Sequence, residues 1–126
     1  MRNLFLFLAF FTLGMTVNAQ QASNNKSLLR HVVIFKFKDS SSPADVKKVA
    51  ESFASLYGKM TQIKSFEWGV NNSPEKFNEG FTHCFVLTFS ADKDLADYQL
   101  NPAHIEFQKI LKPHMEKVFV VDYWVK

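Results

Sequence analysis

The sequence predicts an α+β domain with a ferredoxin-like, split βαβ arrangement, in which a four-stranded antiparallel sheet lies under two helical segments. Apolar and polar side chains alternate along four separate segments, which is the period of a strand. Between those segments, apolar side chains recur at helical spacing. The resulting order is strand, helix, strand, strand, broken helix and strand, which is the order of two βαβ units in one domain.

The first half of the domain contains a strand, a helix and a second strand. Alternation predicts strands over residues 29–38 and 63–70, and helical spacing runs from Ala44 to Met60. The larger side chains of the first strand share one face and are His31, Val33, Phe35 and Phe37. The apolar stripe of the helix, interpreted as core, comprises Val46, Val49, Ala50, Phe53, Leu56, Tyr57 and Met60.

The second half contains a loop, a strand, a broken helix and a last strand. In order, these are a polar loop (71–80), a strand (82–90), a helix (92–100), a second helix (102 to about 112) and the last strand (117–125). Pro113 ends or bends the second helix because proline lacks a backbone N–H and clashes with the preceding turn. The larger side chains of the third strand are His83, Phe85, Leu87 and Phe89.

Residues 1–19 have the features of a secretory signal peptide. A basic start precedes an almost unbroken apolar run over residues 4–17, and the segment ends on a small residue, Ala19. The alternative, a permanent membrane anchor, requires about 18 or more apolar residues, and this run is shorter. Residues 20–28 are polar and predict a disordered lead-in to a domain at 29–126. We therefore expect a periplasmic or secreted protein that has no membrane contact after signal removal.

Charge and cysteine content exclude several kinds of protein. The formal net charge is +3 at pH 7 and the charged residues are dispersed, which leaves no basic patch for a nucleic-acid partner. Cys84 is the only cysteine, so no intramolecular disulfide stabilises the chain despite the predicted export. A small domain without such a crosslink commonly gains burial by self-association.

The apolar pattern of the last strand predicts a homodimer. Two helical segments can cover only one face of a four-stranded sheet. The last strand is nevertheless apolar on both sides, with Phe119, Val121 and Tyr123 on one and Val118 and Val120 on the other. An antiparallel sheet with one face in water would alternate more cleanly. A second copy of the same sheet is the simplest cover for the remaining face.

One histidine follows a break in the helical region. Asn101 is a good N-cap and Pro102 suits the first helical position, which puts His104 at the third. The positive end of the helix dipole disfavours a protonated imidazole, so His104 is expected to be neutral near pH 7. If the break folds Tyr98 back, a phenol and an imidazole face one small site. The alternative is a capped helix start with a buried tyrosine.

Two further histidines share their strand faces with phenylalanines. His31 and His83 are therefore expected to point the same way, and towards the helices they would join Tyr98 and His104 around one cavity. The alternative is that both are hydrogen-bonded core residues. Their spacing lacks the carboxylate partners of known metal motifs, so no metal site is predicted. His114, near the proline break, is expected at the surface.

No other catalytic motif is recognisable in the sequence. It contains no Gly-rich phosphate loop, no Gly-x-Ser-x-Gly motif, no paired cysteines and no carboxylate pair suited to glycoside chemistry. No cofactor is therefore expected. Cys84 lies in the middle of a strand, where we interpret it as a small buried apolar residue and not as a nucleophile.

Four short motifs extend over nearly the whole domain. They are residues 30–38, Gly80-Phe81-Thr82-His83, Asn101-Pro102-Ala103-His104 and Val121-Asp122-Tyr123. Together they resemble the stress-responsive A/B barrel (Dabb) family, and the likeness runs from about Leu29 to the C-terminus. The resemblance implies a dimeric α+β barrel, in which two sheets pack face to face with the helices outside. Asn101 departs from the family, which usually has His there; Asn also caps a helix, but any role of that His in binding or proton transfer is lost.

The resemblance also implies roles for individual residues. Some members of the family fold a linear polyketide and close its ring by aldol condensation. Their catalytic Tyr and His correspond to Tyr98 and His104, and two other pocket histidines correspond to His31 and His83. In that chemistry the imidazole removes a proton beside a carbonyl, while the phenol orients the base or the developing oxyanion.

Three hypotheses for the function stay open. The first is an exported homodimer that binds a small, largely apolar or aromatic molecule in a pocket within each subunit. The second is a carbon-acid enzyme (an aldol cyclase, an isomerase or a lyase) with His104 as the base. The third is a ligand-free structural or stress-protective dimer whose cavity its own aromatic side chains fill. The expected pocket has polar contacts from Tyr98, His104, His31 and His83, and walls formed by Val33, Phe35, Phe53, Phe85 and Leu87.

Overall fold

A computed structural model describes residues 27–126 of the chain. The predicted signal peptide, residues 1–19, and the lead-in up to residue 26 lie outside the described residues. The last two residues of that lead-in, Ser27 and Leu28, are held against the end of the chain. The Ser27 hydroxyl donates to the carbonyl of Val125 at 2.6 Å, and the Val125 N–H donates to the carbonyl of Leu28 at 2.8 Å. The ordered domain therefore begins slightly before the predicted boundary.

The elements follow the predicted order. They are β1 (Leu29–Phe37), α1 (Pro43–Ala54), the 3₁₀ helix η1 (Ser55–Gly58), β2 (Ser65–Val70), β3 (His83–Phe89), α2 (Asp92–Leu100), α3 (Pro102–Leu111) and β4 (Met115–Trp124). The helix expected as far as Met60 changes to 3₁₀ geometry after Ala54. The last strand begins at Met115, two residues earlier than predicted, because a bulge at Lys36/Phe37 lets β1 pair with it there.

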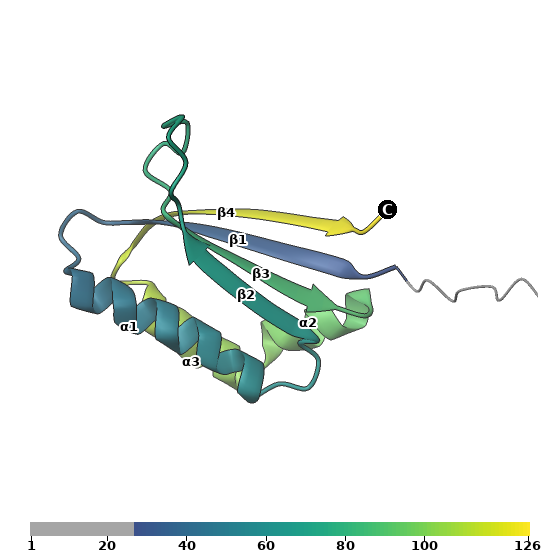
Figure 1. The fold of residues 1–126 in the computed structure, drawn as a ribbon. Helices are drawn as coiled ribbons and strands as arrows, with labels where there is room; N and C mark the ends of the chain where they lie inside the picture. Colours follow the sequence, from purple (N-terminus) through teal and green to yellow (C-terminus); the bar gives the residue numbers. More distant parts are fainter. Residues whose placement is uncertain (1–26) are drawn as a thin grey trace, which may run out of the picture.

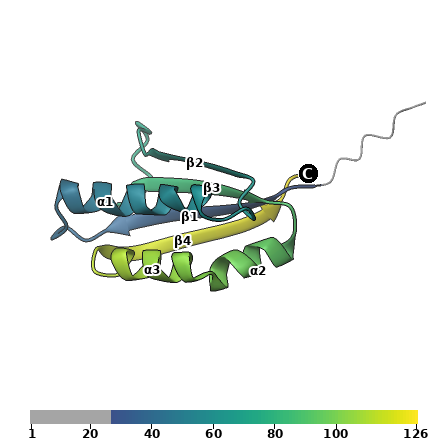
Figure 2. The same ribbon diagram turned by 90° about the horizontal axis from the view of Figure 1, so that it is seen from below.

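The four strands form one antiparallel sheet in the order β2-β3-β1-β4. Figure 1 shows all three α-helices below this sheet, and Figure 2, seen from the helix side, shows α1 beside the α2–α3 segment. The central register places Val33 opposite Phe85 on one side and opposite Val120 on the other. β2 and β4 are therefore the two edges of the sheet. The predicted ferredoxin-like α+β fold is confirmed.

The core lies between the sheet and the helices and is built largely of aromatic rings. Phe53 of α1 stacks on Phe107 of α3 with ring centroids 4.4 Å apart and planes at 10°. Phe53 also meets Phe85 of β3 at 4.7 Å, so one side chain joins two helices to the sheet. Such ring pairs contribute about 0.5–1.5 kcal/mol beyond the apolar area that they bury. The two helical segments are thus tied to each other as well as to the strands.

The start of α1 explains why the chain turns into a helix after β1. The Ser42 side chain accepts from the backbone N–H of Asp45 at 3.1 Å, and the Asp45 carboxylate accepts from the Ser42 N–H at 3.1 Å. This capping box satisfies two N–H groups that the first turn would otherwise leave free. The Ser42 hydroxyl also donates to the Asp45 carboxylate at 2.7 Å, and this bond and the one from the Ser42 N–H lower the pKa of Asp45 because they favour its charged form.

The second face of the sheet is uncovered and apolar. Phe119, Val121 and Tyr123 of β4 lie on this open face and are each about half exposed. Val118 and Val120, on the helix side of the same strand, are exposed as well. Both apolar faces predicted for the last strand are thus present, and the helices leave even the inner face of this edge strand partly open.

A protruding segment between β2 and β3, residues 71–82, rises above the open face, on the side away from the helices (Figure 1). Phe77 of this segment is 84% exposed. Gly80 has φ +83, a conformation that is strained for other residues, and a Cβ there would lie 2.7 Å from Cε of Lys36. Within residues 27–126, no helix has both the length and the apolar character needed to cross a membrane.

Candidate functional site

The break between α2 and α3 positions the two residues that sequence reasoning singled out. Asn101 leaves the helical conformation, with φ −64 and ψ 134, and ends α2. Its side-chain oxygen accepts from the Ala103 N–H at 2.9 Å, which caps α3 as predicted. The chain therefore bends between Tyr98 and His104, and the centroids of their two rings lie 4.4 Å apart. The phenol and the imidazole do share one site.

The His104 ring is held so that one nitrogen is free. Its Nδ1 lies 3.1 Å from the carbonyl oxygen of Gln99, which can only accept. Nδ1 therefore carries the proton of the neutral ring, and Nε2 keeps a lone pair. Burial lowers the pKa of His104 and the nearby His31 lowers it further, while the bond to Gln99 opposes both effects. The predicted neutral state is supported, with burial, and not the helix start, as the main cause.

Tyr98 is the buried donor of the site. It is 1% exposed, and its hydroxyl makes no hydrogen bond to any residue from 27 to 126. Burial raises its pKa far above the ordinary value, so the phenol is fully protonated at neutral pH. A buried hydroxyl without a partner costs about 1–3 kcal/mol. Tyr98 thus keeps a buried donor without a partner among the described residues.

His31 brings a second oriented imidazole to the same place. It is 6% exposed, and its ring lies 5.8 Å from Tyr98 in an edge-on arrangement. Its Nδ1 lies 2.6 Å from the Oδ1 of Asp122. The carboxylate accepts a hydrogen bond from the Nδ1–H group, which leaves the lone pair on Nε2 when the ring is neutral. Asp122 therefore sets the tautomer of His31 as Gln99 sets that of His104.

These groups lie in a cavity of about 600 Å³ between α3, the end of α2 and the sheet. Its remaining walls are apolar for the most part, and three predicted wall residues, Val33, Phe35 and Phe53, line it. The complete lining is His31, Val33, Phe35, Phe53, Tyr98, Gln99, His104, Phe107, Gln108, Leu111, Lys112, Met115, Val118 and Val120. The phenylalanines and the methionine form walls and do not fill the space.

Three residues predicted for this pocket do not line it. Phe85 and Leu87 are fully buried beneath it in the core. His83 lies on the predicted face but at the other end of the sheet, because it pairs with Phe35 while His31 pairs with Leu87. Four residues of strand separate the two pairs, or about 13 Å. Alternation gives the face of a side chain and not its position along the sheet, which is why the prediction joined them.

His83 belongs to a separate aromatic cluster. Its ring packs edge-on against Phe37 at 5.1 Å and lies parallel to Trp68 at 6.2 Å. Its Nδ1 bonds the Thr82 hydroxyl at 2.8 Å, and burial lowers its pKa. These contacts match the hydrogen-bonded core histidine that was the alternative interpretation. His114, expected at the surface, is half-buried and bonds the Ser41 hydroxyl at 2.9 Å.

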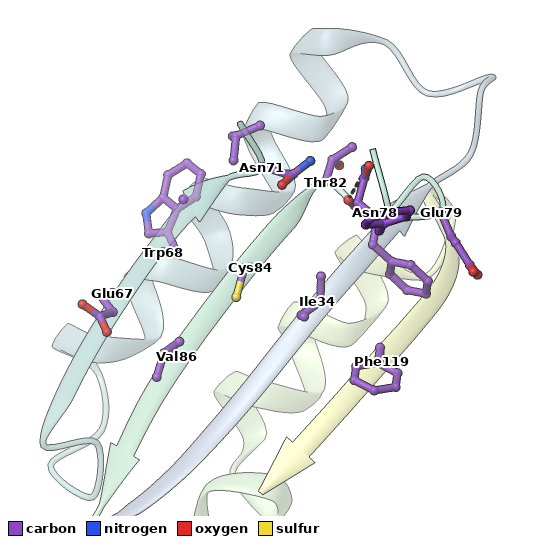
Figure 3. A pocket seen from close by; sticks show the side chains of 14 residues that line it. Ile34, Glu67, Trp68, Asn71, Asn78, Glu79, Thr82, Cys84, Val86 and Phe119 are labelled. Atoms are coloured by element: carbon purple, nitrogen blue, oxygen red, sulfur yellow. Dashed lines mark hydrogen bonds between the residues drawn. The ribbon is translucent and has the colours of Figure 1, made fainter. Parts of the chain in front are cut away.

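A second hollow of about 660 Å³ lies on the open face, beneath the protruding segment (Figure 3). Its floor includes Ile34, Cys84, Val86 and Phe119, and Trp68 and Glu67 line the β2 side. Burial raises the pKa of Cys84 and the negative charge of Glu67 raises it further, so the thiol is protonated and is a poor nucleophile. In the described part of the chain, no three His, Cys, Asp or Glu side chains are placed to hold a metal ion.

The profile of the Stress responsive A/B Barrel Domain family (Dabb) matches residues 29–125. The chain belongs to this family. It is 36% identical to a stress-response A/B barrel domain-containing protein of Arabidopsis thaliana over 98 residues, which are 78% of this chain and 90% of the relative. It is 27% identical to the olivetolic acid cyclase of Cannabis sativa over 95 residues, which are 75% of this chain and 94% of the cyclase.

Solved structures agree with this assignment. The hydroxynitrile lyase of Passiflora edulis superposes with a TM-score of 0.75 at 26% identity, covering 80% of this chain and 95% of the lyase. A dimeric protein of unknown function and ferredoxin-like fold from Bacteroides fragilis superposes with a TM-score of 0.65 at 26% identity, covering 78% and 96%. The fold is therefore shared with one named enzyme of known structure and with a protein described as a dimer.

Sequence reasoning missed several residues of the A/B barrel site. Asp122 was noticed only as part of a family motif, although an acidic side chain within an apolar strand is itself a signal of a specific partner. Gln99, Gln108 and Lys112 are ordinary polar residues of helices in the sequence. Their place in the cavity depends on the rotation and packing of α2 and α3, which local spacing does not determine.

The lowered pKa values of His104 and His83 predict a pH-dependent stability. The folded state favours both neutral rings, whereas the unfolded chain binds protons near the ordinary value of 6.5. The stabilisation that comes from keeping these two rings neutral is complete above pH 6.5. It is lost as the pH falls through the lower pKa values of the two rings in the folded state. We expect the free energy of unfolding, measured by urea denaturation, to decrease below pH 6.5.

The substitution His104→Asn should remove part of this change of the free energy of unfolding with pH. His83→Asn should remove much of the rest. His114→Asn is the matched control, since it replaces a histidine outside both clusters. An unchanged slope in His104→Asn would show that burial does not hold this ring neutral.

Proposed function

We propose that this A/B barrel protein binds a small, largely apolar molecule in the cavity between α3 and the sheet. One observation carries the proposal: the buried Tyr98 hydroxyl has no partner within residues 27–126, and Tyr98 lines a largely apolar cavity together with His104, whose Nε2 is free. A donor and an acceptor side by side suit a carbonyl or hydroxyl group on the ligand. The volume, about 600 Å³, lies in the ordinary range for small-molecule sites.

Two relatives support a site of this kind without fixing its ligand. One is named a cyclase and the other a lyase, and both carry names of enzymes that act on small organic molecules. The cavity also counts against a ligand-free structural dimer, because the protein's own aromatic side chains leave it open. A purely structural role would not require two imidazoles with assigned tautomers at one end.

Native mass spectrometry of protein exported from a bacterial host tests binding directly. We expect a species with extra mass that is lost in Tyr98→Phe, since this change removes only the hydroxyl. Tyr57→Phe is the control, because Tyr57 is half exposed and lies outside the cavity lining. An adduct that survives both Tyr98→Phe and His104→Ala would place the ligand elsewhere.

A second candidate function is proton removal from a carbon next to a carbonyl. The specific observation is the tautomer of His104, whose Nδ1 is occupied by Gln99 so that the basic Nε2 is the free atom. In this step the C–H bond breaks and the proton goes to Nε2; the C–H electron pair forms the new C=C bond, and the C=O π pair moves onto the oxygen to give an enolate. The neutral Tyr98 hydroxyl donates a hydrogen bond to that oxygen as its charge develops.

Exchange of the methyl protons of acetophenone in D₂O, followed by NMR, tests this chemistry. Loss of a general base typically reduces a rate about 10²–10⁴-fold, so we expect a decrease of this order in His104→Gln. The wild-type rate should fall as the pH is lowered through the depressed pKa of His104. A rate that does not depend on pH, or one that His104→Gln leaves unchanged, would exclude His104 as the base.

We further propose that the protein is a homodimer in which a second copy covers the open face. The proposal is supported by the apolar residues exposed there, by the hollow beneath the protruding segment in Figure 3 and by the dimeric relatives of the same fold. Two sheets packed face to face lie about 10 Å apart. The protruding segment rises towards that space, so Phe77 would contact the partner.

A charge placed on the open face should separate the subunits. Phe119→Asp puts one unpaired carboxylate per subunit into the proposed interface, and we expect the dimer dissociation constant to rise roughly 100-fold or more. Sedimentation velocity measures this constant. Ile110→Asp is the control, because it makes the same kind of change on the outer side of α3. Wild-type protein that sediments as a monomer would contradict the proposal.

Export remains part of the proposed function, with activity in the periplasm or outside the cell. It is supported by the character of residues 1–19, which lie outside the described part of the chain. The same mass measurement tests it, since cleavage after Ala19 leaves a chain that begins at Gln20. A retained full-length mass in the exporting host would argue against a cleaved signal.

A further inference from the structure

The cavity is polar at both ends of α3, and the two ends differ. Near the start of α3 lie the hydroxyl of Tyr98 and the imidazole of His104. At the end of the same helix, Lys112 and Gln108 line the cavity, with Leu111 between them and the sheet. His104 and Lys112 are eight residues apart, which corresponds to about 12 Å along a helix axis. Apolar walls separate the two ends.

Lys112 lines the cavity and, like Lys38 and Lys117, has no anionic partner among the described residues. On the same helix, Lys109 pairs with Glu106 at 2.6 Å, and near the start of β4, Lys36 pairs with Glu116 at 3.0 Å. Among the described residues, Lys112 forms no ion pair and its side chain makes no hydrogen bond. No carboxylate lines the cavity either. The cavity therefore has one uncompensated positive charge at its far end.

The position of Lys112 at a helix C-terminus does not explain this arrangement by itself. A cation there is favourable because the helix dipole is negative at that end. Any lysine in the last turn would serve, however, and Lys109 already occupies that turn while pointing to Glu106. What the dipole does not explain is that this second lysine lines the cavity, where no Asp or Glu side chain accompanies it.

We propose that the molecule bound in this cavity is an amphipathic carboxylate, whose anionic group contacts Lys112 while its carbonyl or hydroxyl end lies at Tyr98 and His104. The inference rests on the proposed binding function and specifies the class of ligand for the same cavity. The apolar walls then contact an aliphatic or aromatic linker between the two polar groups. Gln108, beside Lys112, supplies an amide donor to the same carboxylate.

The charge environment favours a carboxylate over a phosphate. A dianionic phosphate is normally held by several donors, commonly an arginine fork or a helix N-terminus. Here a single ammonium is available, and it lies at the negative end of α3, which disfavours a second negative charge. One ammonium and one amide match a single carboxylate, for which lysine acts as a point charge.

Two probes that differ in one group test the inference. They are 6-oxo-6-phenylhexanoate, which carries a ketone and a carboxylate at opposite ends, and its uncharged primary amide. We expect isothermal titration calorimetry to show at least tenfold tighter binding of the carboxylate by the wild-type protein. Lys112→Gln should abolish this preference, and Lys112→Glu should reverse it. Added salt should weaken the preference, because a pair at the exposed cavity mouth is screened.

Lys109→Gln is the matched control, since it removes a lysine from the same helix that does not line the cavity. The preference should persist in this variant. If both probes bind equally to the wild type and both are weakened by Tyr98→Phe, the pocket stands and the inference about Lys112 is wrong. The inference is also overturned if the preference survives Lys112→Gln. If neither probe binds, the proposed binding function and the inference fall together.

Discussion

The cap that Asn101 places on α3 is the local interaction on which the site depends. One amide oxygen bound to one N–H allows α2 to end and α3 to begin without an uncapped turn, and the change of direction occurs at that residue. The bend brings the imidazole of His104 over the phenol of Tyr98. It also directs α3 along the sheet, so that Phe107 can stack on Phe53 of α1. The core and the cavity are thus two results of one bend.

Control of tautomers is the common feature of the two histidines in this site. Each ring has Nδ1 bonded to an oxygen that only accepts, from the Gln99 backbone in one case and from the Asp122 carboxylate in the other. Each therefore presents Nε2 as an acceptor when it is neutral. Tyr98, protonated because it is buried, is the complementary donor. The neutral His104 ring and the Tyr98 phenol thus provide one acceptor and one donor side by side, as the proposed binding of an oxygen-bearing molecule requires.

The sequence allowed the fold and part of the cavity lining to be predicted, and what it missed depends on how the elements pack against one another. Alternation and helical spacing identify which face of an element is buried, and cap chemistry identifies where a helix begins; these rules placed His104 beside Tyr98. They contain no information on strand register, so His83 was assigned to the same site as His31, although the two lie about 13 Å apart along the strands. The roles of Asp122 and Lys112 were likewise hidden, because each depends on contacts between elements distant in the sequence.

One strand of this molecule belongs to two surfaces at once. Val118 and Val120 form a wall of the cavity, while Phe119 and Val121, on the alternate positions of β4, lie on the face assigned to the partner. A shift of this edge strand changes both surfaces together. Under the proposed binding and dimerisation, a ligand that favours the β4 position of the dimer would link the two equilibria reciprocally. Dilution that separates the subunits would then weaken retention of the small molecule, and a bound molecule would strengthen the dimer in equal measure.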